Sequence, residues 1–163
     1  MEPGTFSPEH ISWTEAALRM GCAIVLPLVI GLERFIRKKP IDFRPFVIIS
    51  VAACGLSIAS LELVHKTFDE QLVVDPTRTF EGVVTGIGFL GAGAMFREKN
   101  FVQGAGSAAA IWGAGAIGIV CGIGSLWLAG LIALPIFAVL VLSGPFIGRY
   151  DPSNGDHDRE ADD

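Results

Sequence analysis

The stretch Gly86–Gly93 reads GIGFLGAG and contains the pattern G-x-G-x-x-G. In a soluble protein this pattern marks the phosphate-binding turn of a dinucleotide site, which follows a strand and opens a helix. In a membrane protein the same glycines give a helix a smooth face, which lets another helix approach closely. The sequence around the stretch decides between an oxidoreductase and a protein embedded in a bilayer.

The surrounding chain is apolar and poor in charge. Its 163 residues are 51% hydrophobic and 18% charged, whereas an ordinary soluble domain is about 25% charged. From Asn100 to Gly148 there is no Asp, Glu, Lys or Arg. Because one helix needs about 20 apolar residues to cross a bilayer, this run predicts two crossings joined by a tight turn. A dinucleotide site also needs an acid about 20 residues after the glycines, and none follows Glu98 before Asp151.

Five apolar segments predict an all-α integral membrane bundle of five transmembrane helices. The predicted ranges are about 13–35, 43–63, 77–96, 102–121 and 125–147. We expect residues 1–12 to form a segment outside the membrane, without a cleavable signal peptide, and 13–148 to form the membrane domain. Residues 149–163 are rich in Asp, which predicts a disordered acidic tail.

The distribution of Lys and Arg predicts the orientation of the bundle, because bases gather on the cytoplasmic side. The connections that follow the first and third helices, together with Arg149, hold eight bases. The opposite side holds Lys66 and Arg78. We therefore expect the N-terminus outside and the C-terminus in the cytoplasm of a multi-pass protein. The composition gives no basic surface of the kind that binds nucleic acid.

Small residues recur at helical spacing in the third and fourth segments. Gly82, Gly86 and Gly93 fall on one face, and the fourth segment has small residues at every fourth position. Two interpretations stay open: tight packing between these neighbouring helices, or a dimer interface or substrate path. The predicted helix-packing residues are Gly82, Gly86, Gly88, Gly91, Gly93, Gly106, Ala110, Trp112, Ala114, Gly118 and Gly122.

Several motifs, in order and spacing, make the chain resemble the MgtC/SapB family of bacterial inner-membrane proteins. They are the GLER sequence at 31–34, Arg44, the DPTR sequence at 75–78, the TGIGFLGAG sequence at 85–93 and the stretch 104–112. The resemblance covers roughly residues 16 to 142. It implies a protein of the bacterial inner membrane, linked to magnesium limitation and to virulence-type stress adaptation.

The chain departs from the family pattern at several positions. The family usually has threonine where this chain has Gly106 and Ala110, and a Gln is common at the position of Gly82. Many members also carry a soluble cytoplasmic domain after the last helix, where this sequence has its acidic tail, so the resemblance is to the membrane domain only.

Five charged residues belong to the family-like motifs, and each has a structural and a functional interpretation. Glu33 and Arg34 end the first helix. In the structural interpretation they anchor the helix at the membrane interface. In the functional interpretation Glu33 pairs with Arg34 or Arg44 to hold the first connection, or it binds a cation. Asp75 is placed as an N-cap before Pro76, and Arg78 lies one turn later. The motif charges are Glu33, Arg34, Arg44, Asp75 and Arg78.

Glu81 lies in the apolar span next to Gly82, and an ionisable residue there is a functional candidate. Mg²⁺ prefers oxygen ligands, so Asp75 and Glu81 form a speculative magnesium site, with Asp69 and Glu70 nearby to attract the ion. His10, His65 and His157 are too scattered in the sequence to indicate a metal cluster. No set of nucleophile, base and oxyanion stabiliser is present, so we do not expect an enzyme.

Two functions remain from the sequence. The first is a regulatory or interaction protein that binds a copy of itself, as a dimer, or another membrane protein. The second is a transporter or channel for Mg²⁺ or another cation, formed by an oligomer. We favour the first, because the charged residues lie at helix ends and the centres of the predicted helices lack acids.

Overall fold

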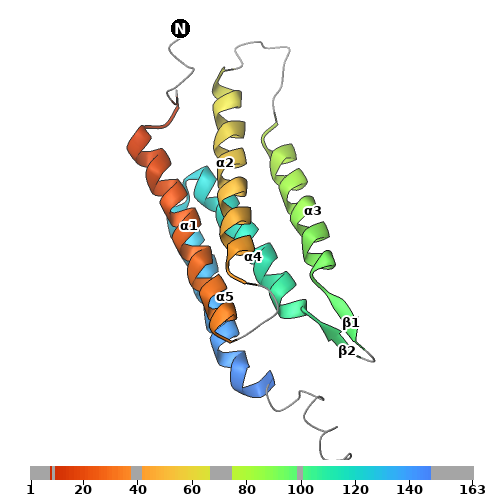
Figure 1. Ribbon diagram of the computed structural model, residues 1–163. Coiled ribbons are helices and arrows are strands. Elements are labelled where there is room, and N and C mark those ends of the chain that lie inside the picture. The colour runs from red at the N-terminus through yellow and green to blue at the C-terminus, as the bar shows by residue number, and fades with distance from the viewer. Residues whose placement is uncertain (1–7, 9, 38–41, 67–74, 99–100, 148–163) are drawn as a thin grey trace, which may run out of the picture.

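The computed structural model describes residues 8, 10–37, 42–66, 75–98 and 101–147. The chain folds into five helices that run alternately up and down, with a short hairpin at one end (Figure 1). The helices are α1 (Trp13–Ile36), α2 (Arg44–Lys66), α3 (Thr77–Gly93), α4 (Ala105–Ile123) and α5 (Leu126–Ile147), and the strands are β1 (Phe96–Glu98) and β2 (Phe101–Gln103).

The predicted all-α bundle of five helices is confirmed, with boundaries within about three residues. Four helices, α1, α2, α4 and α5, are long and apolar enough to cross a membrane. The third is shorter than predicted: α3 has 17 residues, which at 1.5 Å per residue span about 26 Å. The predicted tail at 149–163 and the acidic loop with Asp69 and Glu70 lie outside the described residues.

The hairpin was not predicted. Residues that we assigned to the end of the third helix and the start of the fourth form β1 and β2, which pair antiparallel with Arg97 opposite Val102. Gly104 then begins α4 with φ of 86°, a left-handed conformation that glycine adopts without strain. The connection between α3 and α4 is therefore a β-hairpin and not a short loop.

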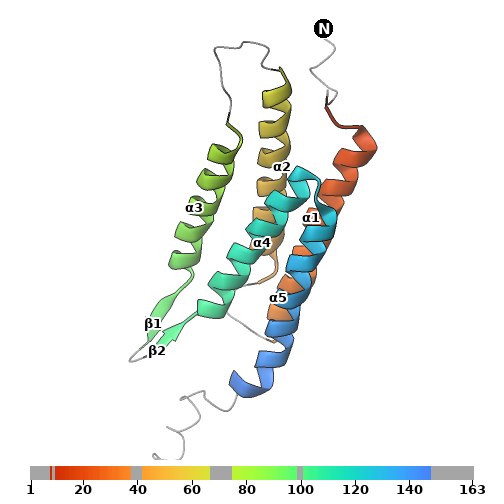
Figure 2. The same cartoon turned by 180° about the vertical axis from the view of Figure 1, so that it is seen from behind.

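The alternating helices place their ends in two groups. We call the group that holds the end of α1 and the starts of α2 and α4 the Arg34 end, because Arg34 lies there. The opposite group, which holds the start of α1 and the ends of α2 and α4, is the Arg19 end. The hairpin extends from the Arg34 end (Figures 1 and 2).

Helix α4 is the centre of the bundle, with α3 on one side and α5 on the other (Figure 2). Most of its residues are buried. A Cβ atom built on Gly118 would lie 2.3 Å from the carbonyl oxygen of Ser50, and one on Gly122 would lie 2.6 Å from that of Cys54. Only glycine therefore lets the backbones of α4 and α2 approach this closely.

Other glycines of α4 receive side chains from its other neighbours. Ile87 of α3 fills the space beside Gly115, because its Cδ1 lies 2.1 Å from where a Cβ would stand. Ile136 of α5 fills the space beside Gly113 in the same way, at 2.8 Å. These two glycines, which are not among the predicted packing residues, attach α3 and α5 to the centre of the bundle.

Helices α3 and α4 are in contact, but Gly82, Gly86 and Gly93 of α3 do not pack against α4 within this chain. On α4, Ala110, Ala114, Gly118 and Gly122 are buried, but the closest contacts of Gly118 and Gly122 are with α2. On α3 only Gly91 is buried among the predicted glycines, where a Cβ would lie 3.6 Å from the carbonyl oxygen of Ala108. The predicted packing residues that are instead exposed are Gly82, Gly86, Gly88, Gly93, Gly106 and Trp112.

Candidate functional site

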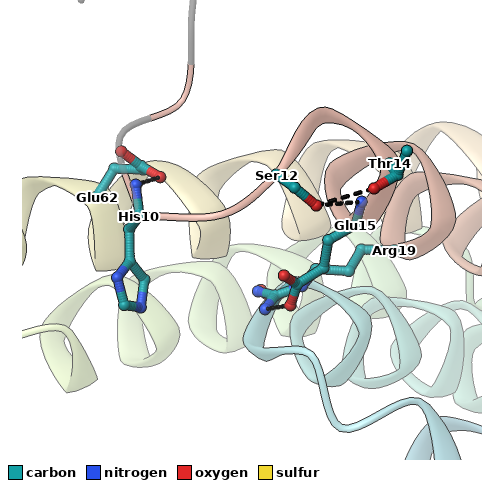
Figure 3. Close-up of polar contacts among 7 residues, drawn as sticks. His10, Ser12, Thr14, Glu15, Arg19 and Glu62 are labelled. Carbon is teal, nitrogen blue, oxygen red and sulfur yellow. Dashed lines mark hydrogen bonds and ion pairs between the residues drawn. The ribbon is translucent and has the colours of Figure 1, made fainter.

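The Arg19 end is fixed by a buried arginine (Figure 3). Ser12 accepts a hydrogen bond from the backbone N–H of Glu15 at 3.1 Å and so caps the start of α1. Glu15 forms an ion pair with Arg19, which lies four residues later and so on the same face of the helix. Arg19 also donates to the carbonyl oxygen of Gly122 at 2.6 Å. Its positive charge lies where the last carbonyls of α4 carry partial negative charge, so it stabilises that helix end and ties it to α1.

Two histidines that are far apart in the sequence meet at this end. The rings of His10 and His65 stack with centroids 3.4 Å apart. The backbone N–H of His10 donates to the carboxylate of Glu62 at 3.0 Å (Figure 3). Nothing in the sequence indicated this contact, and within the described part of the chain no three potential ligands gather as a metal site.

Glu33 lies buried at the Arg34 end. Its side chain is 7% exposed, and its carboxylate forms an ion pair with Arg37 Nε at 2.5 Å. The N–H is not aligned for a hydrogen bond, and neither carboxylate oxygen accepts one from the described residues. Arg37 in turn donates to the carbonyl oxygen of Val141 at 2.9 Å, which links α1 to α5. The ion pair of Glu33 is therefore with Arg37 rather than with Arg34 or Arg44, although its charge also acts on Arg34.

Arg34 is turned toward α4. Its Nη2 donates to the hydroxyl of Ser107 at 2.6 Å. Arg34 as a whole is 7% exposed, and its buried Nε has no hydrogen-bond partner among the described residues. The structure thus places two of the predicted motif charges, the buried Glu33 and Arg34, in one cluster with the buried Ser107 and the exposed Arg37.

Arg44 stands apart from this cluster. It is exposed and binds Asp42 through an ion pair and through a hydrogen bond from its Nε at 2.7 Å. Asp42 also accepts from the backbone N–H of Arg44 at 2.9 Å, which satisfies the first turn of α2. The side-chain hydrogen bond from Arg44 is the main reason that the pKa of Asp42 lies below its usual range. This motif arginine therefore holds the start of α2.

Asp75 holds the start of α3, but the helix begins one residue later than predicted, so Asp75 lies one residue before the cap position. The helix begins at Thr77, and Pro76 occupies the cap position. The Asp75 carboxylate accepts from the Thr77 hydroxyl at 2.6 Å and from its backbone N–H at 2.9 Å. These hydrogen bonds, in that order, and the nearby charge of Arg78 hold the pKa of Asp75 below its usual range.

Arg78 and Glu81 are exposed on the first two turns of α3. No contact between Asp75 and Glu81 is present, and the hydrogen-bonded oxygen of Asp75 is used by its own helix. The magnesium site at Asp75 and Glu81 therefore stays a prediction.

Two residues of this cluster, Arg37 and Ser107, were not predicted as partners of Glu33 and Arg34. Arg37 lies four residues after Glu33, a spacing that brings side chains together on a helix, so this pair was predictable. The contact between Arg34 and Ser107 joins residues 73 positions apart, and no sequence signal indicates it.

The chain is similar over most of its length to known membrane proteins. The model of the MgtC family matches residues 20–148. An uncharacterized protein of Haemophilus influenzae is 36% identical over 89% of this chain and 60% of its own length. Protein SapB of Bacillus subtilis is 34% identical over 70% of this chain and 51% of its own length. Protein MgtC of Brucella abortus is 32% identical over 83% of this chain and 55% of its own length.

The chain thus spans little more than half the length of these curated relatives. No solved structure matches it.

Proposed function

The chain belongs to the MgtC family, and from this membership and the fold we propose that it is a regulatory or interaction protein of the membrane, without enzymatic activity. In this proposal one helix face of the bundle binds a second copy of the chain or another membrane protein. The role is linked to magnesium limitation and virulence-type stress adaptation, as the family resemblance implies.

The observation that carries the proposal is the outward face of α3. Gly82, Gly86 and Gly93 lie on this face at spacings of four and seven, and a Cβ on any of them would meet nothing within 4 Å. Phe89 projects from the same face and is 80% exposed. Helices associate in lipid through faces of small residues that allow close backbone contact. In this chain Gly113, Gly115, Gly118 and Gly122 of α4 pack against other helices, whereas Gly82, Gly86 and Gly93 of α3 remain available.

The proposed orientation places the Arg34 end in the cytoplasm and the N-terminus outside a bacterial inner membrane. The support is the excess of Lys and Arg in the connections at this end. Glu33, Arg34 and Arg44, which the family-like motifs contain, would then all act at the cytoplasmic face.

Cation transport is the second candidate function, and Glu81 favours it. An exposed carboxylate on a membrane helix calls for a partner, and Mg²⁺ is a suitable one. The positions of the charged residues argue against an ion path through a single copy of the chain. The buried charged side chains lie near helix ends, and α4 and α5 contain no charged residue. A path between copies would require the oligomer that the first candidate also predicts.

Self-association in liposomes tests the interaction proposal. Energy transfer between donor-labelled and acceptor-labelled copies is measured while the lipid content is raised at constant protein. We expect transfer that falls on dilution, and we expect Gly86→Leu to weaken association about tenfold, or by about 1.4 kcal/mol, since the larger side chain blocks the close approach of the backbones. Gly130→Leu on α5 is the matched control, because Gly130 also has nothing within 4 Å.

An equal effect of both substitutions would argue against a specific face on α3. Unchanged association in Gly86→Leu would place the interface elsewhere and remove the observation on which the proposal rests.

A further inference from the structure

The guanidinium of Arg34 lies against the first turn of α4. Besides its hydrogen bond to Ser107 Oγ, its two terminal nitrogens both lie 3.5 Å from where a Cβ of Gly106 would stand. The residue is more than nine-tenths buried, and its Nε lacks a hydrogen-bond partner among the described residues. A buried cation is thus held at the start of a helix and is incompletely hydrogen-bonded.

The start of α4 itself has no cap. Gly104 precedes the helix and has no side chain to accept a hydrogen bond, and the first turn contains no acidic residue. The backbone N–H groups of Ala105, Gly106 and Ser107 have no partner within the helix, because the first intrahelical bond is made by Ala108 to Gly104. Unsatisfied N–H groups at a helix start carry partial positive charge.

One carboxylate in the described part of the chain, that of Glu33, acts on Arg34, and it is shared with Arg37, with which it forms its ion pair. Asp42 pairs with Arg44 at the exposed start of α2. The hydrogen-bond partner of Arg34 is the neutral hydroxyl of Ser107, so positive charge remains in excess here. Since a positive helix end and a guanidinium repel each other, their contact is stable when an anion lies between them. Ala105 and Gly106 are exposed, so an anion can reach the free N–H groups from outside the bundle.

We propose that the start of α4 and Arg34 form a binding site for a phosphate group. The backbone N–H groups of a helix start bind tetrahedral oxyanions. The planar fork of Arg matches phosphate oxygens, and the hydroxyl of Ser107, which accepts from Arg34, keeps the guanidinium in place. The phosphate belongs to a phospholipid headgroup or to a soluble phosphate, because the site lies at an end of the helices where both are present. The site is independent of the α3 face.

Thermal unfolding of the purified chain in a neutral detergent tests the site. One arm adds inorganic phosphate at constant ionic strength against chloride, because general screening must not differ between samples. The other arm adds phosphatidylglycerol to the micelles, against phosphatidylcholine. We expect Tm to rise by about 5 °C at saturation in at least one arm. A rise with phosphatidylglycerol alone identifies the lipid headgroup, and a rise with inorganic phosphate shows that a soluble anion suffices.

Three variants make the test specific. Arg34→Gln is expected to lose the rise. Gly106→Asp places a carboxylate beside Arg34 and the helix start, so its Tm without ligand should exceed that of the wild type and its response should disappear. Arg44→Gln removes an exposed charge at the same end and should respond as the wild type does. The proposal is overturned if the wild type responds in neither arm, or if Gly106→Asp keeps the full response, even where Arg34→Gln fails to fold.

Discussion

The contact between α4 and α2 predicts opposite effects for two glycine-to-alanine substitutions. In Gly118→Ala the new methyl would lie 2.3 Å from the carbonyl oxygen of Ser50 and 2.8 Å from its Cα. Ordinary contact would require the backbones to separate by about 1 Å. Overpacking of this kind destabilises by about 1–3 kcal/mol, and both obstructing atoms are backbone, which places the cost near the upper limit. Alanine regains about 1 kcal/mol of helix propensity, so we expect a net loss of about 2 kcal/mol.

Gly86→Ala should behave in the opposite way, because its methyl would meet nothing within 4 Å. Only the gain in helix propensity remains, so the substitution should stabilise α3 by about 0.5–1 kcal/mol. The two variants should therefore differ by about 3 kcal/mol in the free energy of unfolding. Gly130→Ala, which is also open, is the control for alanine on an unobstructed helix face.

The assay is reversible unfolding in mixed micelles as the fraction of dodecyl sulfate is raised, followed by far-UV circular dichroism. The protein is dilute enough that a micelle holds one copy, so that association between copies does not contribute. If Gly118→Ala is as stable as the wild type while Gly86→Ala is destabilised, α3 rather than α2 packs closely on the centre of the bundle, and our description of the fold is wrong.

Three further predictions concern the charged groups. Arg19→Gln should destabilise the chain by about 1.5–3 kcal/mol in the same unfolding assay, because it leaves the Gly122 carbonyl without its charged donor; a change under 0.5 kcal/mol would contradict the capping role. Arg37→Gln should cost about 1–3 kcal/mol, because it leaves the buried carboxylate of Glu33 without its ion-pair partner, and unchanged stability would refute that reasoning. Because the pKa of Asp75 is depressed in the folded chain, its contribution to stability is present above about pH 4 and is lost as pH falls below it. The protection of the amides at the start of α3 against hydrogen exchange, corrected for the intrinsic rate at each pH, should therefore fall below about pH 4 in the wild type, whereas in Asp75→Ala it should be low already at about pH 6 and show no such fall.

The sequence predicted the helices because their signal is local. A run without charge and with few breaks must be satisfied by its own backbone hydrogen bonds in lipid, which indicates both the type and the number of the elements. The hairpin at Phe96–Gln103 was missed because strands of three residues leave no period to detect. Arg97 and Lys99 read equally well as the polar end of a helix.

The partner of each helix face was not predictable in the same way. Gly106, Ala110, Ala114, Gly118 and Gly122 show that α4 has a smooth face, but their spacing is compatible with any neighbour. The choice of α2 depends on side chains distant in the sequence. The same limit applies to the candidate site: the i,i+4 pairs of α1 follow from helix geometry, whereas the contact of Arg34 with Ser107 exists only in the assembled bundle.

The measurement that tests the proposed function most directly is Mg²⁺ uptake by proteoliposomes that contain the purified, folded chain. Empty vesicles and a Glu81→Gln variant are measured beside the wild type. An interaction protein predicts uptake equal to that of empty vesicles for both forms of the chain. Uptake above that level by the wild type, lost in Glu81→Gln, would contradict the account and make this chain a cation transporter with Glu81 on its path.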